Sequence, residues 1–125
     1  MKRHECLLCI GSNEQSEANL ILARKELVRL FPDIHFGKEA LTIPLFFVHN
    51  HNLFRNQLGK FSSELSIESI QQHLKQIEKF AGRQPEDKAQ ELVKLDIDLL
   101  IYNHQILKPK YLERDYIKEL ICLMD

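Results

Sequence analysis

The sequence has no tryptophan, no apolar run close to the ~20 residues of a membrane-spanning helix, and no excess of charge of either sign. Its 17 basic and 18 acidic residues give a formal net charge of −1, which argues against a general nucleic-acid-binding protein. The apolar stretch that follows "MKRHE" is too short for a signal peptide. We therefore expect a cytoplasmic protein that associates with neither membrane nor nucleic acid, of an oligomeric state that the sequence leaves open.

Cysteine is also scarce, and its spacing does not complete a metal-binding motif. Cys6 and Cys9 have C-x-x-C spacing inside the apolar run "ECLLCIG", but a zinc knuckle needs a second pair, and Cys122 is far away in the chain. We interpret Cys6 and Cys9 as small core residues of a buried strand in a reducing compartment.

The 125 residues are 44% hydrophobic, contain no repeat, and suffice for one domain, residues 1–125. Apolar residues at steps of three and four predict a helix from about Ser16 to Leu30. A second helix should begin after Ser66, as N-cap, and end at Gly82. Apolar runs bounded by turn residues predict strands at residues 5–10, 34–43, 56–65 and 93–103, and residues 116–124 predict a last short helix.

These elements follow the order β-α-β-β-α-β, which is typical of an α+β protein. We expect a ferredoxin-like core, in which a mostly antiparallel four-stranded sheet has two helices on one face, followed by a C-terminal tail. Gly37 interrupts the second strand and is expected at a β-bulge. We expect irregular structure at residues 44–54 and a mobile segment at the polar run "RQPEDKAQE", residues 83–91.

The most informative segment is "VKLDIDLLIYN", residues 93–103, where two aspartates lie in an apolar strand. Because side chains alternate across a strand, we expect two faces, a core face of Leu95, Ile97, Leu99 and Ile101 and an opposite face of Lys94, Asp96, Asp98 and Leu100. The two carboxylates would lie about 6–7 Å apart at their backbones and repel each other by about 2.5 kcal/mol at an effective dielectric of 20. A cation between them would remove this repulsion, and oxygen ligands suit Mg²⁺.

An ordinary solvated strand face explains the same pattern, since alternating acids are common there, and Lys94 could simply pair with Asp96. His49 and His51, in "FFVHNHN", have a spacing that allows metal binding, but no third ligand is nearby in the sequence, and a polar loop explains them equally. Phe46 and Phe47, beside them, could instead cover a substrate site.

Several short segments recur in an order that is informative as a set. They are Gly11-Ser12-Asn13, Thr42-Ile43-Pro44-Leu45, Phe54-Arg55-Asn56-Gln57, Ile77-Glu78, Gly82-Arg83 and Asp96-Ile97-Asp98-Leu99-Leu100. Together, over about residues 5–121, they resemble the family of 6-hydroxymethyl-7,8-dihydropterin pyrophosphokinase, an enzyme of the folate pathway. The resemblance implies transfer of diphosphate from ATP to the hydroxymethyl oxygen of the pterin, release of AMP, and two Mg²⁺ ions bound by Asp96 and Asp98.

The resemblance also implies a role for each matched position. As catalytic residues it indicates Arg83, Asp96, Asp98 and Lys110. As ATP-binding residues it indicates Glu78, Arg83, Lys94, Lys110, Tyr111 and Arg114. As the pterin pocket it indicates Thr42, Pro44, Leu45, Phe54, Asn56 and Tyr116, since an aromatic platform with an Asn amide suits a flat ring with alternating donors and acceptors.

The chain departs from the family's pattern around the aspartate strand. Val93 stands where the family usually has an arginine, Pro85 replaces a basic residue, Lys110 replaces a histidine, and the family's loop tryptophan is absent. Loss of one phosphate-binding arginine could slow the transfer about 10²–10³-fold. Three alternatives stay open: a slow enzyme, a relative that binds nucleotide or pterin without turnover or serves as a partner subunit, and an unrelated interaction domain in which the two aspartates lie outside any cleft.

Overall fold

Five strands and five helical segments make up the part of the chain that the computed structural model describes, residues 2–44 and 46–124. In chain order they are β1 (His4–Ser12), α1 (Ser16–Leu30), β2 (His35–Thr42), β3 (Phe54–Ser63), α2 (Ile67–Phe80), the 3₁₀-helix η1 (Pro85–Gln90), β4 (Asp96–Tyr102), β5 (Gln105–Ile106), α3 (Pro109–Leu112) and α4 (Asp115–Leu123). The first four strands and the two long helices follow the predicted order.

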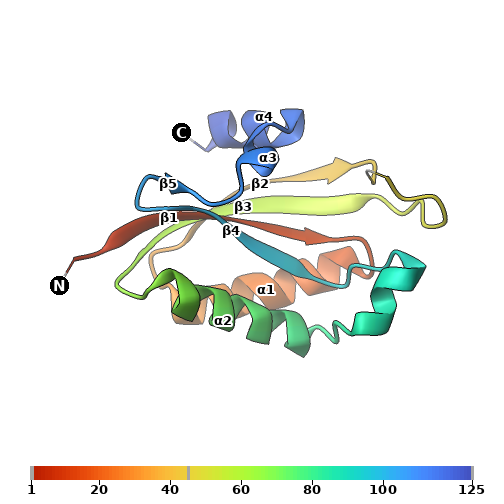
Figure 1. The fold of residues 1–125 in the computed structure, drawn as a ribbon, viewed down its shortest axis with the longest axis horizontal. Coiled ribbons are helices and arrows are strands. Elements are labelled where there is room, and N and C mark those ends of the chain that lie inside the picture. Colours follow the sequence, from red (N-terminus) through yellow and green to blue (C-terminus); the bar gives the residue numbers. More distant parts are fainter. Residues whose placement is uncertain (1, 45, 125) are drawn as a thin grey trace.

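The described strands form one sheet in the order β2-β3-β1-β4-β5, and every pairing is antiparallel (Figure 1). The α+β class is therefore confirmed. The expected four strands are wrong, because the chain turns back after β4 and adds the two-residue strand β5 at the sheet edge. A register shift between Phe36 and Glu39 confirms the bulge at Gly37. In the sheet centre Gly11 of β1 lies opposite Asp96 of β4, which brings two of the matched segments together.

The two long helices cover one face of the sheet and follow the sequence rules that predicted them. α1 begins at Ser16 and ends at Leu30, as the apolar spacing indicated. The Ser66 hydroxyl accepts a 3.2 Å hydrogen bond from the Ser69 N–H at the start of α2, and Gly82 has a φ of 91° just beyond its end. That left-handed backbone favours glycine, which explains why α2 stops there.

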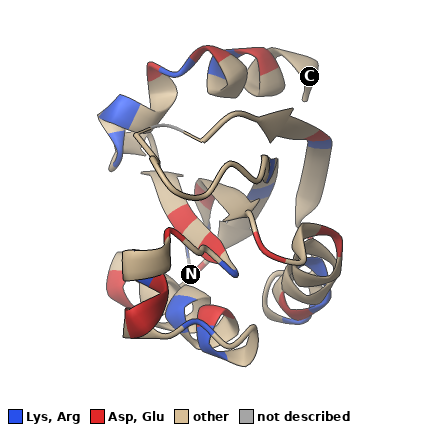
Figure 2. Cartoon of the chain, turned by 90° about the vertical axis from the view of Figure 1, so that its right-hand side faces the viewer, with Lys and Arg blue, Asp and Glu red and all other residues tan. Residues whose placement is uncertain are grey.

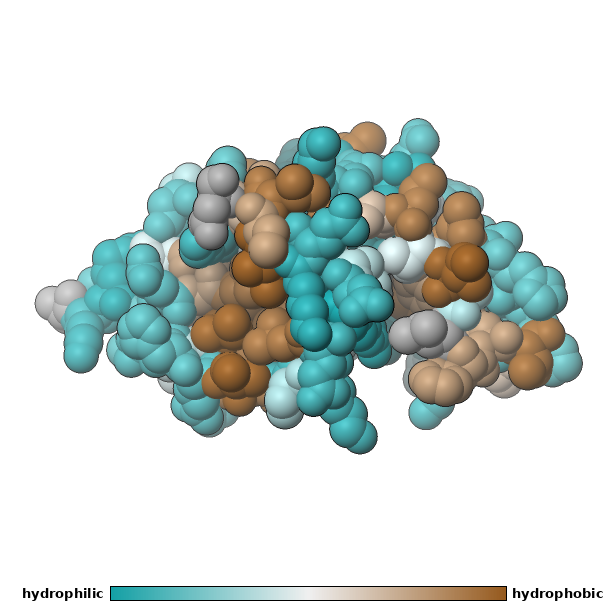
Figure 3. Space-filling model, turned by 90° about the horizontal axis from the view of Figure 1, so that it is seen from above, coloured by the Kyte–Doolittle hydropathy of each residue, from teal (hydrophilic) through white to brown (hydrophobic). Residues whose placement is uncertain are grey.

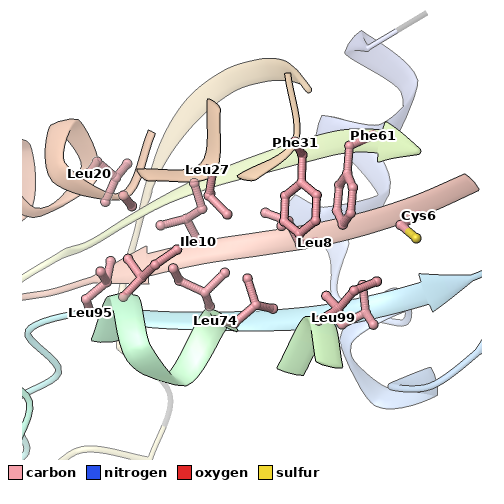
Figure 4. Packing of buried hydrophobic residues seen from close by; sticks show 14 residues of the cluster. Cys6, Leu8, Ile10, Leu20, Leu27, Phe31, Phe61, Leu74, Leu95 and Leu99 are labelled. Atoms are coloured by element: carbon pink, nitrogen blue, oxygen red, sulfur yellow. The ribbon is translucent and has the colours of Figure 1, made fainter. Parts of the chain in front are cut away.

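The core between this face and the helices is formed by side chains from β1, β3, β4, α1 and α2 (Figure 4). Within this core the rings of Phe31 and Phe61 stack with their centroids 4.1 Å apart. Around Leu95 and Leu99 the core contacts the aspartate strand, and it fixes which face of β4 is buried.

The other face of the sheet is covered by α4, which packs against β2 and β3. A second apolar cluster lies there and is built of Leu7, Cys9, Leu58, Leu100, Ile117 and Leu120. The short helix predicted at residues 116–124 in the C-terminal tail is present as α4, and its Ile117 and Leu120 are buried against the sheet. From the α4 side, apolar surface lies on both sides of a central hydrophilic band (Figure 3).

Strand β4 keeps the predicted alternation only up to Leu99. Leu7 and Leu8 of β1 pair with Ile101 and Leu99, so Leu100 is an extra residue in a β-bulge. Leu100 and Ile101 consequently both contact the second cluster, and the prediction that Ile101 belongs to the first core is wrong. The aspartates precede this bulge, so their shared face is unaffected.

The polar run at residues 83–91 forms regular structure and contacts its neighbours. Pro85–Gln90 forms η1, and the buried Asp87 carboxylate accepts a 3.0 Å hydrogen bond from the Gln84 N–H. Lys94 donates to the Gly82 carbonyl at 2.9 Å and lies 3.4 Å from Asp87. The suggested ion pair between Lys94 and Asp96 is therefore wrong, because Lys94 instead fastens η1 to the end of α2.

Cys6 and Cys9 are buried in β1 as free thiols, as interpreted from the sequence. Within residues 2–44 and 46–124, no group of three or more His, Cys, Asp or Glu side chains is arranged to hold a metal. His49 and His51 therefore belong to no such group of described residues. No described helix is long and apolar enough to cross a membrane.

Candidate active site

The two aspartates of β4 share one face, where acidic positions lie in the middle of the molecule between the helical layers (Figure 2). The Tyr111 hydroxyl of α3 donates a 2.7 Å hydrogen bond to Asp98 Oδ2 and lies 3.4 Å from Asp96 Oδ2. Arg83, just after α2, donates to Asp96 Oδ1 at 2.9 Å. The pair is thus bridged by a hydroxyl on one side and held by a guanidinium on the other.

The surroundings of Asp98 favour its protonated form when no cation is bound. Burial raises the pKa of Asp98 to about 7, and the Asp96 carboxyl adds to the increase, while the Tyr111 hydroxyl and Lys108 act in the opposite direction. Burial, with Asp98 and Asp96 nearby, also raises the pKa of the Cys9 thiol to about 12, so this thiol stays neutral. A divalent cation would therefore both compete with a proton and relieve the repulsion between the carboxyls.

Glu78 and Arg83 connect the end of α2 to the start of β4. The Glu78 carboxylate lies 3.1 Å from Arg83 Nη1 and accepts a 2.8 Å hydrogen bond from the Ile97 N–H. Burial raises the pKa of Glu78, and the Ile97 amide and Arg83 oppose that increase. Both predicted residues therefore reach the aspartates, Arg83 directly and Glu78 through Arg83 and the strand backbone.

A cavity of about 770 Å³ opens on one side of the aspartates, between the ends of β2 and β3 and the segment from α3 to α4. It is lined by Cys9, Gly11, Thr42, Ile43, Phe54, Asn56, Asp96, Tyr111, Glu113, Arg114, Asp115 and Tyr116. Four of the six predicted pterin residues lie in this wall, namely Thr42, Phe54, Asn56 and Tyr116.

The polar and aromatic groups of this cavity have fixed positions. The Asn56 side chain is buried and donates from Nδ2 to Thr42 Oγ1 at 2.9 Å. The Arg114 guanidinium lies 4.1 Å from the centroid of the Tyr111 ring and donates to the Tyr116 hydroxyl at 3.1 Å. A Cβ at Gly11 would lie 3.4 Å from Asn56 Oδ1, which is close to an ordinary van der Waals contact. The arrangement can bind a flat heterocycle between aromatic rings and an amide.

A second cavity of about 350 Å³ opens on the other side of the aspartates, between α2 and β4. It is lined by Gln71, Leu74, Lys75, Glu78, Arg83, Asp96, Ile97, Asp98, Leu99 and Lys108. Asp96 lines both cavities. A ligand in one cavity and a ligand in the other would therefore approach each other at this carboxylate.

Not every predicted site residue reaches these cavities. Lys94 is engaged by Asp87 and the Gly82 carbonyl, and Lys110 is exposed and lines neither cavity that contains Asp96. Pro44 also lies outside the lining of the larger cavity, and Leu45 lies outside the described residues. Like the other assigned roles, these four stay predictions from the resemblance.

The loop at residues 46–53 is held by one carboxylate from the other side of the site. Glu91, which follows η1 with a φ of 55°, accepts hydrogen bonds from the N–H groups of Val48, His49 and Asn50 at 2.6–3.1 Å. Although desolvation acts in the opposite direction, these three amides lower the pKa of Glu91. The ring centroids of Phe47 and Phe54 are 5.7 Å apart, but Phe47 lines neither cavity that contains Asp96, so a covering role for it stays a prediction.

Phe46, beside Phe47, is 96% exposed, so it does not cover the site as was suggested for it.

Val93, where the resemblance implies an arginine, is held through its backbone. Its N–H donates to Asn13 Oδ1 at 2.7 Å, and its carbonyl accepts from the Asn13 N–H at 2.9 Å. The "GSN" turn after β1 therefore positions the start of the aspartate strand.

Several residues at the site escaped the sequence-based prediction. Lys75, Gln71 and Lys108 in the smaller cavity and Glu113 and Asp115 in the larger one carry no motif. Only the spacing of Gln71, Lys75 and Glu78 along one helix face was available as a signal. Glu91 gave no signal, since its three acceptor contacts depend on a loop about 40 residues earlier in the chain.

The donor set of the carboxylate pair fits Mg²⁺. Asp96 and Asp98 offer oxygen ligands on one face, and within the described ranges no third acidic, His or Cys side chain completes a cluster around them. Mg²⁺ is typically bound by one or two carboxylates together with substrate phosphates and water. The Tyr111 hydroxyl is hydrogen-bonded to both carboxylates. A cation bound between the carboxylates would replace this hydroxyl as their partner.

A family model described as "7,8-dihydro-6-hydroxymethylpterin-pyrophosphokinase (HPPK)" matches residues 7–125, nearly the whole chain. The match includes every residue of both cavities. A search of curated proteins finds no match.

Proposed function

This chain belongs to the 7,8-dihydro-6-hydroxymethylpterin-pyrophosphokinase family, and on that basis we propose that it transfers diphosphate from ATP to 6-hydroxymethyl-7,8-dihydropterin and releases AMP in folate biosynthesis. The observation that supports this best is the position of Asp96 in the walls of two cavities of unequal size. A transferase for two substrates needs such an arrangement, with the reacting groups meeting at the metal-binding carboxylates.

The larger cavity would bind the pterin. Phe54 and Tyr116 supply aromatic surface, and the Asn56 amide, held by Thr42, supplies fixed hydrogen-bonding groups for the ring edge. The pterin's hydroxymethyl group would then point toward Asp96.

The smaller cavity would bind ATP, with Glu78 and Arg83 on its wall. Two Mg²⁺ ions at Asp96 and Asp98 would neutralise the phosphates and stabilise the departing AMP. In the transfer the pterin oxygen forms a bond to the β-phosphorus, the bond from that phosphorus to the α-phosphate oxygen breaks, and the hydroxyl proton leaves to solvent. Arg83 would hold Asp96 in place and present its remaining N–H groups to phosphate.

Incubation of the protein with ATP, Mg²⁺ and 6-hydroxymethyl-7,8-dihydropterin, followed by chromatography of nucleotides, tests the proposal. We expect AMP to form in proportion to the pterin consumed, and Asp96→Ala to abolish it. Glu119→Ala, on the exposed side of α4, is the matched control for removal of an acid and should leave the rate unchanged. ATP binding that is indifferent to Mg²⁺ and to Asp96→Ala would contradict the proposal.

A relative that binds both ligands without turnover is the second candidate. It is favoured by Val93, which offers no guanidinium, and by Lys94, which is engaged by Asp87 and is not directed at the cavities. Binding of ATP and pterin to the unchanged protein with no AMP over hours would identify this case.

A further inference from the structure

Most basic side chains expected to bind the nucleotide are already engaged by protein groups. Arg83 contacts Glu78 and Asp96, Lys94 contacts Asp87, and Arg114 donates to the Tyr116 hydroxyl. A triphosphate brings about four negative charges, so cations without a protein partner should matter most for its binding.

Lys108 is such a cation and lies in the smaller cavity beside Asp98. Across the described residues it makes no hydrogen bond or ion pair through its ammonium group, and Lys75 lies in the wall of the same cavity. Its ammonium is close enough to Asp98 to lower the pKa of that carboxyl. Lys110, two residues later, lines neither cavity at the aspartates.

The backbone around Lys108 is fixed on both sides. The preceding Leu107 N–H donates to the Leu100 carbonyl at 2.8 Å, which ties this segment to β4. The Lys108 carbonyl accepts from the Tyr111 N–H at 3.1 Å, and Pro109 starts α3 directly after it. Lys108 is thus the N-cap of the helix that carries the tyrosine at the aspartates, and its position is coupled to the site.

We propose that Lys108, rather than Lys110, is the lysine that binds a phosphate of the magnesium-bound nucleoside triphosphate in the cavity between α2 and β4. This assignment rests on the proposed function of the same site and adds a phosphate-binding residue to it. A lysine ammonium is a compact point charge on a flexible stem, so it can follow a phosphate oxygen without the planar geometry that an arginine requires. In this chain it would supply positive charge that Val93 cannot.

A purely structural role for Lys108 predicts something different. If its ammonium only balanced the charge of Asp98, its removal would strengthen the binding of a bare divalent cation at the aspartates and leave the nucleotide's own contribution unchanged. Two titrations distinguish these roles. One uses Mn²⁺ alone and is monitored by electron paramagnetic resonance, and the other uses the magnesium-bound nucleotide.

The test compares Lys108→Ala, Lys108→Arg and Lys110→Ala with Lys118→Ala, an exposed lysine of α4 that serves as the matched control. Binding of a non-hydrolysable ATP analogue with Mg²⁺ is measured by calorimetry. We expect Lys108→Ala to weaken binding about tenfold, Lys108→Arg to restore most of it, and Lys110→Ala and Lys118→Ala to change it by less than about twofold. Mn²⁺ binding without nucleotide should not weaken in Lys108→Ala and should stay within about twofold in the other three variants.

A loss in Lys110→Ala with Lys108→Ala unchanged would overturn the assignment, as would a changed Mn²⁺ affinity without a change for the nucleotide. Release of AMP in the presence of pterin is measured in parallel. Nucleotide binding that depends on Lys108 without any AMP supports the assignment and contradicts the proposed transferase. Normal AMP release and normal nucleotide binding by Lys108→Ala supports the transferase and overturns the assignment.

Discussion

The burial of Asp98 predicts how pH and Mg²⁺ together change the stability of the protein. In the metal-free protein the pKa of Asp98 is raised to about 7, first by burial and then by Asp96, whereas an aspartate in an unfolded chain titrates near 3.9. The folded state therefore binds this proton more tightly than the unfolded state. Tyr111, Lys108, Cys9 and Arg83 are further titratable or charged groups that face it.

The sign of the effect follows from this difference. Below about pH 4 the carboxyl is protonated in both states and costs nothing. As the pH rises from about 4 to 7, the unfolded state ionises first, so the free energy of unfolding falls. A difference of about three pKa units corresponds to at most about 4 kcal/mol, and partial solvent screening reduces this to about 2 kcal/mol. Asp98→Asn cannot ionise and should escape the loss.

The assay is thermal unfolding of both proteins from pH 5 to pH 8, with and without Mg²⁺. We expect Asp98→Asn to gain stability relative to the unchanged protein as the pH rises, by about 5–10 °C at pH 8. Saturating Mg²⁺ should stabilise the unchanged protein at pH 8 and leave Asp98→Asn unaffected, because a ligand that binds only the folded state stabilises it.

Asp33→Asn is the control with the opposite sign. The Ser62 hydroxyl lowers the pKa of Asp33, so this carboxylate stabilises the fold above about pH 4 and loses that contribution on acidification. Its removal should therefore cost more at pH 7 than at pH 3 and should not respond to Mg²⁺. A pH-independent difference for Asp98→Asn, or equal stabilisation of both proteins by Mg²⁺, would refute the electrostatic account of the pair.

Three further predictions concern single contacts at the site. Tyr111→Phe removes the hydroxyl that donates to Asp98, so Mn²⁺ should bind at least as tightly while the metal-free protein loses about 1 kcal/mol of stability; weaker Mn²⁺ binding would show that the hydroxyl is a ligand. Glu91→Gln weakens the acceptor of three loop amides, so hydrogen exchange at Val48 and Asn50 should accelerate several-fold, and unchanged exchange would contradict the tether. Val93→Arg restores the family's guanidinium and should raise the rate of AMP release about tenfold or more, whereas an unchanged rate would show that another step is limiting.

Local rules carried much of the prediction of the fold. The start and end of α1, the Ser66 cap and the Gly82 terminus depend on residues close by in the chain, and all four were predicted from the local sequence. The shared face of Asp96 and Asp98 also followed from strand alternation, since the first bulge of β4 comes only at Leu100.

The errors occurred where contacts distant in sequence decide the structure. The bulge that turns Ile101 to the second cluster arises from pairing with β1, more than 90 residues earlier in the chain. The segment 83–91 lacks apolar periodicity, yet residues Pro85–Gln90 form η1, which Asp87 caps and Lys94 joins to α2. The covering of the second sheet face by α4 could not be deduced from the order of the elements, because its apolar side would fit either face.

The lysines around Pro109 show a limit of transferring roles by motif. Matching Pro109-Lys110 to the family's Pro-His pair pointed to Lys110, because a motif records only the order of residue types. In the folded chain Pro109 begins α3, so Lys108 precedes this helix as its N-cap while Lys110 lies within it. Of these two lysines, Lys108 lines the cavity that contains Asp98 and Lys110 does not. Where a residue of a family motif is substituted, the backbone sets the direction of the new side chain. That direction must be known before a role is assigned to the residue.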